Sequence, residues 1–307
     1  MEYSFMMIVV YIFIFLFGIA IIRLGLEQAT PARVKSLIER STSHPLAGLF
    51  VGFAVTAVLQ SSTAVMVLAV SLVAARVIPF RQTIAIILGS NVGTTITLEL
   101  LVFSGETLGM VTLVLGVVAL LTRKRSLFLF GMTFCGIGCM FLAMDGMGEW
   151  GEAFASHGFA STLIEHNMSN LVSMLGGTVL ASIIQSSTAA IAIGIQLYAN
   201  QVLSLEAVIS IMMGANVGTC LTAVLAAFGA GRGAMQTAMA NVFLNLGGAL
   251  LFLPFVSLFA YFVMQLTTDP ATQVAHASVL FNVICSLLLL PFIHPFASLV
   301  ERVTGEK

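Results

Sequence analysis

The sequence has very little charge. Only 8% of its 307 residues are Asp, Glu, Lys or Arg, and 59% are hydrophobic, whereas soluble domains have about 25% charged residues. So few charges cannot cover a surface in water, and apolar runs long enough to cross a bilayer recur along the chain. The composition excludes a soluble domain. It predicts an all-α polytopic membrane protein, with the lipid bilayer and no nucleic acid among its partners.

Cysteine is also scarce. All four cysteines lie in apolar segments, and two of them, Cys135 and Cys139, share a helix face; the others are Cys220 and Cys285. No His, Asp or Glu stands at helical spacing from the pair within its segment. Buried free cysteines behave as small hydrophobic residues. We therefore expect neither a disulfide framework nor a metal centre.

A cleavable leader is missing too. Met1-Glu2-Tyr3-Ser4 contains no basic residue and no small-residue cleavage site follows, so the first apolar run is interpreted as a retained span. No soluble domain is expected after the last apolar run, because the sequence stops at Lys307. We predict a single transmembrane domain over residues 1–307.

The polar residues that are present include a duplicated motif. Gln60-Ser61-Ser62-Thr63 recurs as Gln185-Ser186-Ser187-Thr188, 125 residues later. A second element, Gly-(Ser/Ala)-Asn-Val-Gly-Thr, follows each copy at the same distance, over residues 89–94 and 214–219. Two motifs at one offset indicate an internal duplication, with repeats at 46–122 and 171–264. Polar residues inside membrane segments are functional candidates by default.

Seven apolar stretches are predicted to be spans: 5–22, 82–103, 107–122, 126–144, 205–228, 234–264 and, as the final span, 272–298. Two others, 46–75 and 171–200, hold the Gln-Ser-Ser-Thr copies near their centres. An arm such as Leu46–Leu59 has 14 residues, about 21 Å of helix. The hydrocarbon core is about 30 Å thick, so we predict that each of these stretches is a re-entrant helical hairpin.

The basic residues support the hairpins. With two hairpins and the N-terminus outside, all twelve Lys and Arg residues fall on the cytoplasmic side, as does the C-terminus. If each of the two stretches were a single span, five of these basic residues would move outside. If each stretch crossed the membrane twice, all twelve would stay inside, and only the short length of the arms argues against that alternative. Three spans separate the hairpins, so they enter from opposite faces. This predicts inverted-topology repeats, the arrangement of many secondary transporters.

Gln-Ser-Ser-Thr supplies neutral donors and acceptors beside a helix start. Hydroxyl and amide side chains bind anions there together with free backbone N–H groups. An alternative is that they join helices by hydrogen bonds, although two copies at inverted positions favour a site. The predicted anion-binding residues are Gln60, Ser61, Ser62, Thr63, Gln185, Ser186, Ser187 and Thr188.

Neither hairpin contains a charged residue, so a bound anion needs cations nearby. The second motif offers hard oxygen ligands, on helices that its glycines are expected to unwind and to open to close approach. Cation-coupled anion transport follows, with Na⁺ as coupling ion and no other cofactor. The hard oxygens that suit Na⁺ are those of Asn91, Thr94, Thr95, Asn216 and Thr219.

Two weaker features remain open. Glu99 lies well inside a predicted span, where it either reaches the outer interface or couples a cation or proton. Asn245 precedes Pro254 by nine residues, as Asn282 precedes Pro291. The packing of two scaffold helices explains this echo as well as a site does.

The paired motifs resemble those of the type II sodium-dependent phosphate cotransporter family. That family carries two Gln-Ser-Ser-Ser-type motifs, each followed by Gly-(Ala/Ser)-Asn-(Ile/Val)-Gly-Thr. The resemblance covers both repeats and continues through Phe281-Asn282. It implies that the hairpin tips, in the cell membrane, coordinate inorganic phosphate and Na⁺. On the matching positions this implies phosphate at both Gln-Ser-Ser-Thr copies, and Na⁺ also at Gln60, Ser62, Gln185 and Ser187. Thr63 and Thr188 stand where the family commonly has a third Ser, and the hydroxyl is retained.

The leading hypothesis is therefore a Na⁺-coupled symporter of inorganic phosphate that works by alternating access. A carrier of sulfate or another oxyanion, or an exporter of the same build, fits the motif chemistry as well. An intramembrane serine hydrolase is a remote alternative, because a nucleophilic Ser needs an adjacent base and no His falls within either hairpin. We expect no enzymatic activity.

Overall fold

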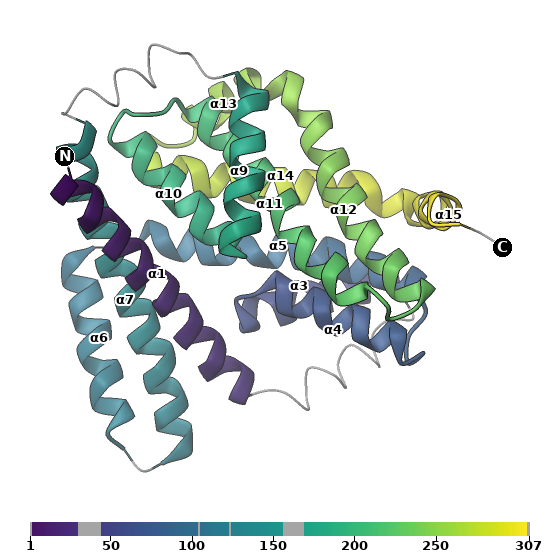
Figure 1. Ribbon diagram of the computed structural model, residues 1–307, viewed down its shortest axis with the longest axis horizontal. Coiled ribbons are helices and arrows are strands. Elements are labelled where there is room, and N and C mark those ends of the chain that lie inside the picture. The colour runs from purple at the N-terminus through teal and green to yellow at the C-terminus, as the bar shows by residue number, and fades with distance from the viewer. Residues whose placement is uncertain (1, 30–43, 104, 123, 156–168, 306–307) are drawn as a thin grey trace.

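A computed structural model describes residues 2–29, 44–103, 105–122, 124–155 and 169–305 (Figure 1). Every regular element in these ranges is a helix, as predicted. Six stretches are long and apolar enough to cross a membrane: Met6–Leu26, Phe80–Val102, Arg125–Trp150, Leu205–Ala227, Arg232–Met264 and Pro270–Val303. The chain is a multi-pass helical membrane protein.

The long helices are α1 (Glu2–Ala29), α5 (Phe80–Val102), α7 (Arg125–Ala155), α11 (Leu205–Ala227), α12 (Arg232–Phe252) and α14 (Pro270–Leu289). Five shorter apolar helices accompany them: α3 (Pro45–Leu59), α4 (Ser62–Ala74), α6 (Glu106–Leu120), α9 (Asn170–Ile184) and α10 (Ser187–Ala199). Helices α1, α6 and α7 pack together at one side of the molecule (Figure 1).

One predicted span is shorter than the others. The stretch 107–122 forms α6, which has only 15 residues, about 22 Å of helix, and is therefore shorter than the six candidate spans. The other predicted spans lie on long helices. Five of the basic residues used for the predicted orientation lie outside the described residues: Arg33, Lys35, Arg40, Arg123 and Lys307.

Each Gln-Ser-Ser-Thr motif breaks its apolar stretch into two short helices, as predicted. Gln60 ends α3 in the left-handed conformation, with φ 53°, and Gln185 ends α9 with φ 59°. The amide of each Gln donates to a carbonyl three residues back, Ala57 O or Ser182 O, at 2.6 Å. A non-glycine residue at positive φ cannot continue a helix, so the side-chain bond stabilises the break.

The two repeats also share their helix contacts. A Cβ added to Gly89 would lie 1.8 Å from Leu49 O, and one added to Gly214 would lie 1.9 Å from Met174 O. Both pairs are related by the offset of 125 residues. These glycines let α3 approach α5, and α9 approach α11, backbone to backbone. Helices α5 and α11 run unbroken through the motif, so the expectation that its glycines unwind them was wrong.

Helices α5 and α11 run in opposite directions. The start of α5, at Phe80, and Ala230, just after α11 ends, line the same pocket. The last turn of α5 reaches the start of α14 through Glu99. The end of α10, which leads into α11, reaches that same part of α14 through a hydrogen bond from Tyr198. These two helices occupy matched positions in the duplication.

The repeated spacing of Asn245 to Pro254 and Asn282 to Pro291 also has a structural counterpart. Helix α12 continues through the 3-10 turn η1 (Leu253–Phe255) into α13 (Val256–Met264), and α14 continues through η2 (Leu290–Phe292) into α15 (Ile293–Val303). Each turn has the sequence Leu-Pro-Phe. Proline lacks the N–H that a continuing α-helix needs, so the echo marks two bent helices.

The apolar core consists of two clusters. One packs α10, α11 and α14 against α1 and α7, with Met144, Met212 and Phe281 among its members. The other joins α4 and the first half of α5 to α12, and includes Val65 and Ile84. The site described next lies where α4, α5, α11 and α12 meet.

Candidate functional site

A small polar cavity lies between α4, α5, α11 and α12. We call it the asparagine cavity; it is lined by Ser62, Thr63, Met66, Asn91, Thr94, Asn216, Thr219, Asn241 and Asn245. No residue in this lining carries a formal charge. Its volume is about 20 Å³, which is room for one water-sized occupant.

Both repeats contribute matched residues to this cavity. Asn91 and Thr94 come from α5, and their counterparts Asn216 and Thr219 come from the antiparallel α11. Ser62 and Thr63 add the first turn of α4. The structure therefore brings six predicted site residues from three separate helices to one place.

The asparagines form a partly satisfied hydrogen-bond network. Asn91 Nδ2 donates to Asn245 Oδ1 at 3.1 Å, and Asn245 Nδ2 donates to both the carbonyl and the side-chain oxygen of Asn241. Asn216 Nδ2, by contrast, is buried without a hydrogen-bond partner among the described residues. A buried unpaired amide costs about 1–3 kcal/mol. Because an amide nitrogen donates hydrogen bonds, such a group beside a polar cavity indicates a place for an acceptor such as water.

The first serine of each motif has a structural role. Ser61 Oγ accepts a hydrogen bond from the N–H of Ala64, and Ser186 Oγ accepts one from the N–H of Ala189. They are the N-caps of α4 and α10. Capping satisfies one of the four N–H groups that a helix start leaves open, so the remaining N–H groups of each first turn can meet an anion.

The glutamine of each motif binds its own repeat's long helix. Gln60 Oε1 accepts a hydrogen bond from Thr97 at 2.5 Å, and Gln185 Oε1 accepts one from Thr222. Both threonines stand 37 residues after their glutamine, and the repeat offset relates them. These bonds hold each helix break against α5 or α11. Sequence reasoning did not find these threonines, whose matched spacing was the available signal.

The other predicted site residues lie elsewhere. The asparagine cavity is not lined by the two glutamines, by the N-cap serines, or by the second-repeat residues Ser187 and Thr188, which are buried. Thr95 faces a different pocket, of about 520 Å³, together with Glu99 and His276. The tip of α3–α4 therefore shares the asparagine cavity with the Gly-(Ser/Ala)-Asn-Val-Gly-Thr motifs of α5 and α11, whereas the tip of α9–α10 does not.

Glu99 has a defined partner. Its Oε1 lies 2.9 Å from Nδ1 of His276 on α14, and both side chains are about one-third exposed. The pair joins the last turn of α5 to the first turns of α14. His276 is therefore placed beside a carboxylate, and no described histidine is hydrogen-bonded to a serine of either motif.

Sequence reasoning also missed Asn241 and left Asn245 undecided. They stand one helical turn apart on α12, and both are buried. The signal for them was two amides at i and i+4 within an apolar segment that contains no other charged or amide residue between Met239 and Phe262. Asn282, the echo of Asn245, lies outside the cavity and donates to Ser278 O.

An uncharged polar cavity, lined by matched residues of an internal duplication in a helical membrane protein, is the kind of site that transporters have. The chain belongs to the Na⁺/Pi-cotransporter family. The family model matches residues 14–149 and, a second time, residues 151–286, in agreement with the duplication.

Individual relatives are similar over most of the chain. YqeW of Bacillus subtilis (strain 168) is 36% identical over 261 residues, 85% of either protein. YjbB of Escherichia coli (strain K12), which its name proposes as an inorganic phosphate export protein, is 29% identical over 256 residues, 83% of this chain and 47% of YjbB. The chain thus spans about half the length of YjbB.

A shorter match links the chain to an animal protein. Sodium-dependent phosphate transport protein 2B of Bos taurus is 46% identical over 55 residues, which is 18% of this chain and 8% of that protein. No solved structure gives a significant match.

Proposed function

We propose that the protein carries inorganic phosphate across the cell membrane by alternating access, with Na⁺ as the coupling ion. The observation that carries this proposal is the asparagine cavity, in which matched residues of the antiparallel helices α5 and α11 meet the tip of α3–α4. Family membership and the names of YjbB and the Bos taurus relative support phosphate as the substrate.

The cavity suits a cation better than the anion. Its volume of about 20 Å³ is too small for a tetrahedral oxyanion, whereas side-chain oxygens of Asn, Ser and Thr are hard ligands of the kind that Na⁺ takes. The unbroken α5 and α11 offer few free backbone carbonyls. We therefore assign the sodium ligands to the side chains of Ser62, Asn91, Thr94, Asn216 and Thr219.

Phosphate is assigned to the two tips. The first turns of α4 and α10 each present N–H groups beyond the one that Ser61 or Ser186 caps, and helix starts attract anions. Ser62 belongs to both the tip and the cavity, so it is the residue through which bound Na⁺ and bound phosphate would be neighbours. Gln60 and Gln185 position the tips.

The antiparallel course of α5 and α11 supports inverted repeats with two re-entrant hairpins. On this proposal α6 crosses the membrane although it has 15 residues, which a locally thinned bilayer accommodates. Arg76, Arg81 and Arg232 share one end of the molecule. The positive-inside rule makes that end cytoplasmic and leaves the N-terminus outside.

The decisive experiment is uptake of radiolabelled phosphate into proteoliposomes, with an inward Na⁺ gradient and with a matched K⁺ gradient. We expect phosphate uptake with the Na⁺ gradient but not with the K⁺ gradient, and only weak competition by sulfate. Uptake that is equal in both gradients removes Na⁺ coupling from the proposal, and full competition by sulfate removes phosphate selectivity.

Export is the second candidate, and the name of YjbB favours it. Proteoliposomes loaded with phosphate distinguish the two candidates when Na⁺ is left out on both sides. A Na⁺-independent exporter then still releases phosphate into a phosphate-free medium, whereas a Na⁺-coupled symporter does not. A hydrolase is not favoured: Ser61 and Ser186 are occupied as helix caps, and His276 is paired with Glu99.

A further inference from the structure

The first two turns of α14 are bonded to both repeats. Tyr198, at the end of α10, donates a hydrogen bond from its hydroxyl to Oε1 of Gln273 at 2.6 Å. Three residues further along α14, Nδ1 of His276 lies 2.9 Å from Oε1 of Glu99, in the last turn of α5. We call these four residues the α14 clamp. It ties α14 to a helix of the second repeat and to a helix of the first.

Gln273 is the buried centre of the clamp. Its side-chain oxygen accepts from Tyr198, and its side-chain nitrogen donates to the carbonyl of Thr267 at 2.8 Å, in the turn between α13 and α14. Glu99 and His276, by contrast, are about one-third exposed and line the pocket of about 520 Å³. Water can therefore replace their bond when it breaks.

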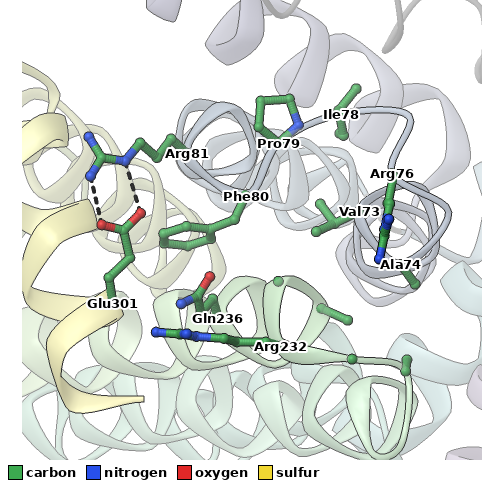
Figure 2. Close-up of a pocket in the computed structure, with 14 residues that line it drawn as sticks. Val73, Ala74, Arg76, Ile78, Pro79, Phe80, Arg81, Arg232, Gln236 and Glu301 are labelled. Atoms are coloured by element: carbon green, nitrogen blue, oxygen red, sulfur yellow. Dashed lines mark hydrogen bonds and ion pairs between the residues drawn. The ribbon is translucent and has the colours of Figure 1, made fainter. Parts of the chain in front are cut away.

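The opposite end of the molecule has matched positions without these bonds. At an offset of 37 residues, Gln236 on α12 matches Gln273, and at the repeat offset of 125, Val73 on α4 matches Tyr198. Both Val73 and Gln236 line a pocket of about 790 Å³ between the end of α4 and the start of α12, which we call the α4–α12 pocket (Figure 2). Valine has no hydrogen-bonding side chain, so the bond of Tyr198 has no equivalent at this position.

The second bond of the clamp is also confined to one end. The two offsets match Glu99 with Val224 and His276 with Met239. These two apolar residues pack against the core cluster of α4, α5 and α12. The α14 clamp is thus a polar feature that the sequence places at one end of a repeated framework.

The ion pair at the edge of the α4–α12 pocket joins different elements. Arg81 donates from Nε to Oε1 of Glu301 at 2.9 Å and from Nη2 to Oε2 at 2.6 Å, as Figure 2 shows. This pair connects the start of α5 to α15. It does not hold the end of α4 against α12 in the way that Tyr198 holds the end of α10 against α14.

We propose that the α14 clamp is the outer gate of the protein. The inference rests on the proposed function, because alternating access requires the helices around the site to separate at one end at a time. Opening toward the outside then breaks the bonds that tie α14 to α10 and α5. A hydrogen bond that water can replace contributes little net free energy, so such a gate opens and closes easily. The α4–α12 pocket marks the cytoplasmic end, and the present structure has its outer gate closed.

Thiol labelling from one side of the membrane tests the gate. The reporter is Ser278→Cys, a change of similar size at a buried position on α14 just beyond Gln273 and His276. Membrane vesicles of known orientation receive an impermeant thiol reagent on the outer face. Mass spectrometry follows each cysteine separately, so the native cysteines stay in place. We expect Tyr198→Phe and Glu99→Val each to speed labelling of the reporter roughly fivefold, equivalent to about 1 kcal/mol for one hydrogen bond.

Tyr261→Phe is the matched control, because it makes the same change at an exposed tyrosine of α13. It should leave the labelling rate unchanged. Reagent added to the inner face distinguishes a gate from general loosening of the fold, and the clamp variants should label no faster from that face. An unchanged rate from outside, an equal rise from both faces, or the same rise in Tyr261→Phe overturns the proposal.

The labelling needs no transported substrate, so it is independent of the uptake experiment. A rise from outside alone, in a protein that takes up no phosphate, removes the proposed substrate and keeps the gate. Uptake driven by Na⁺ without that rise removes the gate and keeps the proposed function.

Discussion

The helix pairs α3–α4 and α9–α10 have the same local structure and different surroundings. Both break at a left-handed glutamine, both are capped by the following serine, and both approach a long helix at a glycine. Only the tip of α3–α4 lines the asparagine cavity, through Ser62 and Thr63. Local sequence therefore builds the tip, whereas the packing of α4 against α11 and α12 makes it part of a site.

The glycine contacts should give the largest effects, equal in the two repeats. Gly89→Val and Gly214→Val each place a side chain on a backbone carbonyl less than 2 Å from the new Cβ, so α3 or α9 must move away. We expect a loss of about 3 kcal/mol or more, seen as a lost monodisperse peak in size-exclusion chromatography. Gly176→Ala, where a Cβ meets nothing within 4 Å, is the control. A stable Gly89→Val protein contradicts the close approach.

Alanine substitutions at the two matched asparagines should differ in how much stability they cost. Asn91→Ala removes the donor to Asn245 and leaves a buried acceptor unpaired, at a cost of about 1–3 kcal/mol. Asn216→Ala removes an amide nitrogen that has no partner among the described residues, so it should cost little. Thermal unfolding in detergent without Na⁺, followed by the fluorescence of Trp150, measures both. Equal losses would show that the network does not distinguish the repeats.

Replacing the second serine of each Gln-Ser-Ser-Thr motif compares the contributions of the two tips to transport. Ser62→Ala removes a hydroxyl from the cavity wall, and we expect roughly tenfold lower phosphate uptake, equivalent to about 1.4 kcal/mol. Ser187→Ala should also impair uptake, but less, because Ser187 lies buried outside this cavity. Surface expression controls for insertion. Near-normal uptake by both variants contradicts a site at the tips.

The N-cap serines should give the smallest and most similar effects. Ser61→Ala and Ser186→Ala each remove one helix cap, worth about 1 kcal/mol. Their unfolding temperatures should fall together. Ser61→Thr, which retains a capping hydroxyl without adding a charge, should restore stability if capping is the role of Ser61. A much larger loss in one repeat would break the equivalence of the two tips.

Much of this local structure could be predicted from the sequence. The repeated Gln-Ser-Ser-Thr marked both helix breaks, because small hydroxyl residues cap a new helix. The 125-residue offset also identified the partners Asn91 and Asn216. The opposite directions of α5 and α11 agree with the topology that was predicted from the side of the membrane on which the basic residues fall. That distribution is a sum over many loops.

The long-range contacts could not be predicted. Asn241 joins the cavity only because α12 packs beside α5 and α11, and nothing in its apolar segment specifies that neighbour. Glu99 meets His276 across 177 residues. The motif glycines were expected to unwind α5 and α11, because glycine permits both unwinding and close approach; the contact with Leu49 O shows which of the two applies at Gly89.

The most direct test of the account is the Na⁺ concentration that gives half-maximal phosphate uptake. The asparagine cavity predicts that Asn216→Ala raises this concentration at least about tenfold, because a lost ligand worth about 1.4 kcal/mol changes affinity by that factor. Asn282→Ala, a buried asparagine outside the cavity, should leave it unchanged. An unaltered Na⁺ dependence in Asn216→Ala would contradict the assignment of the cavity as the sodium site.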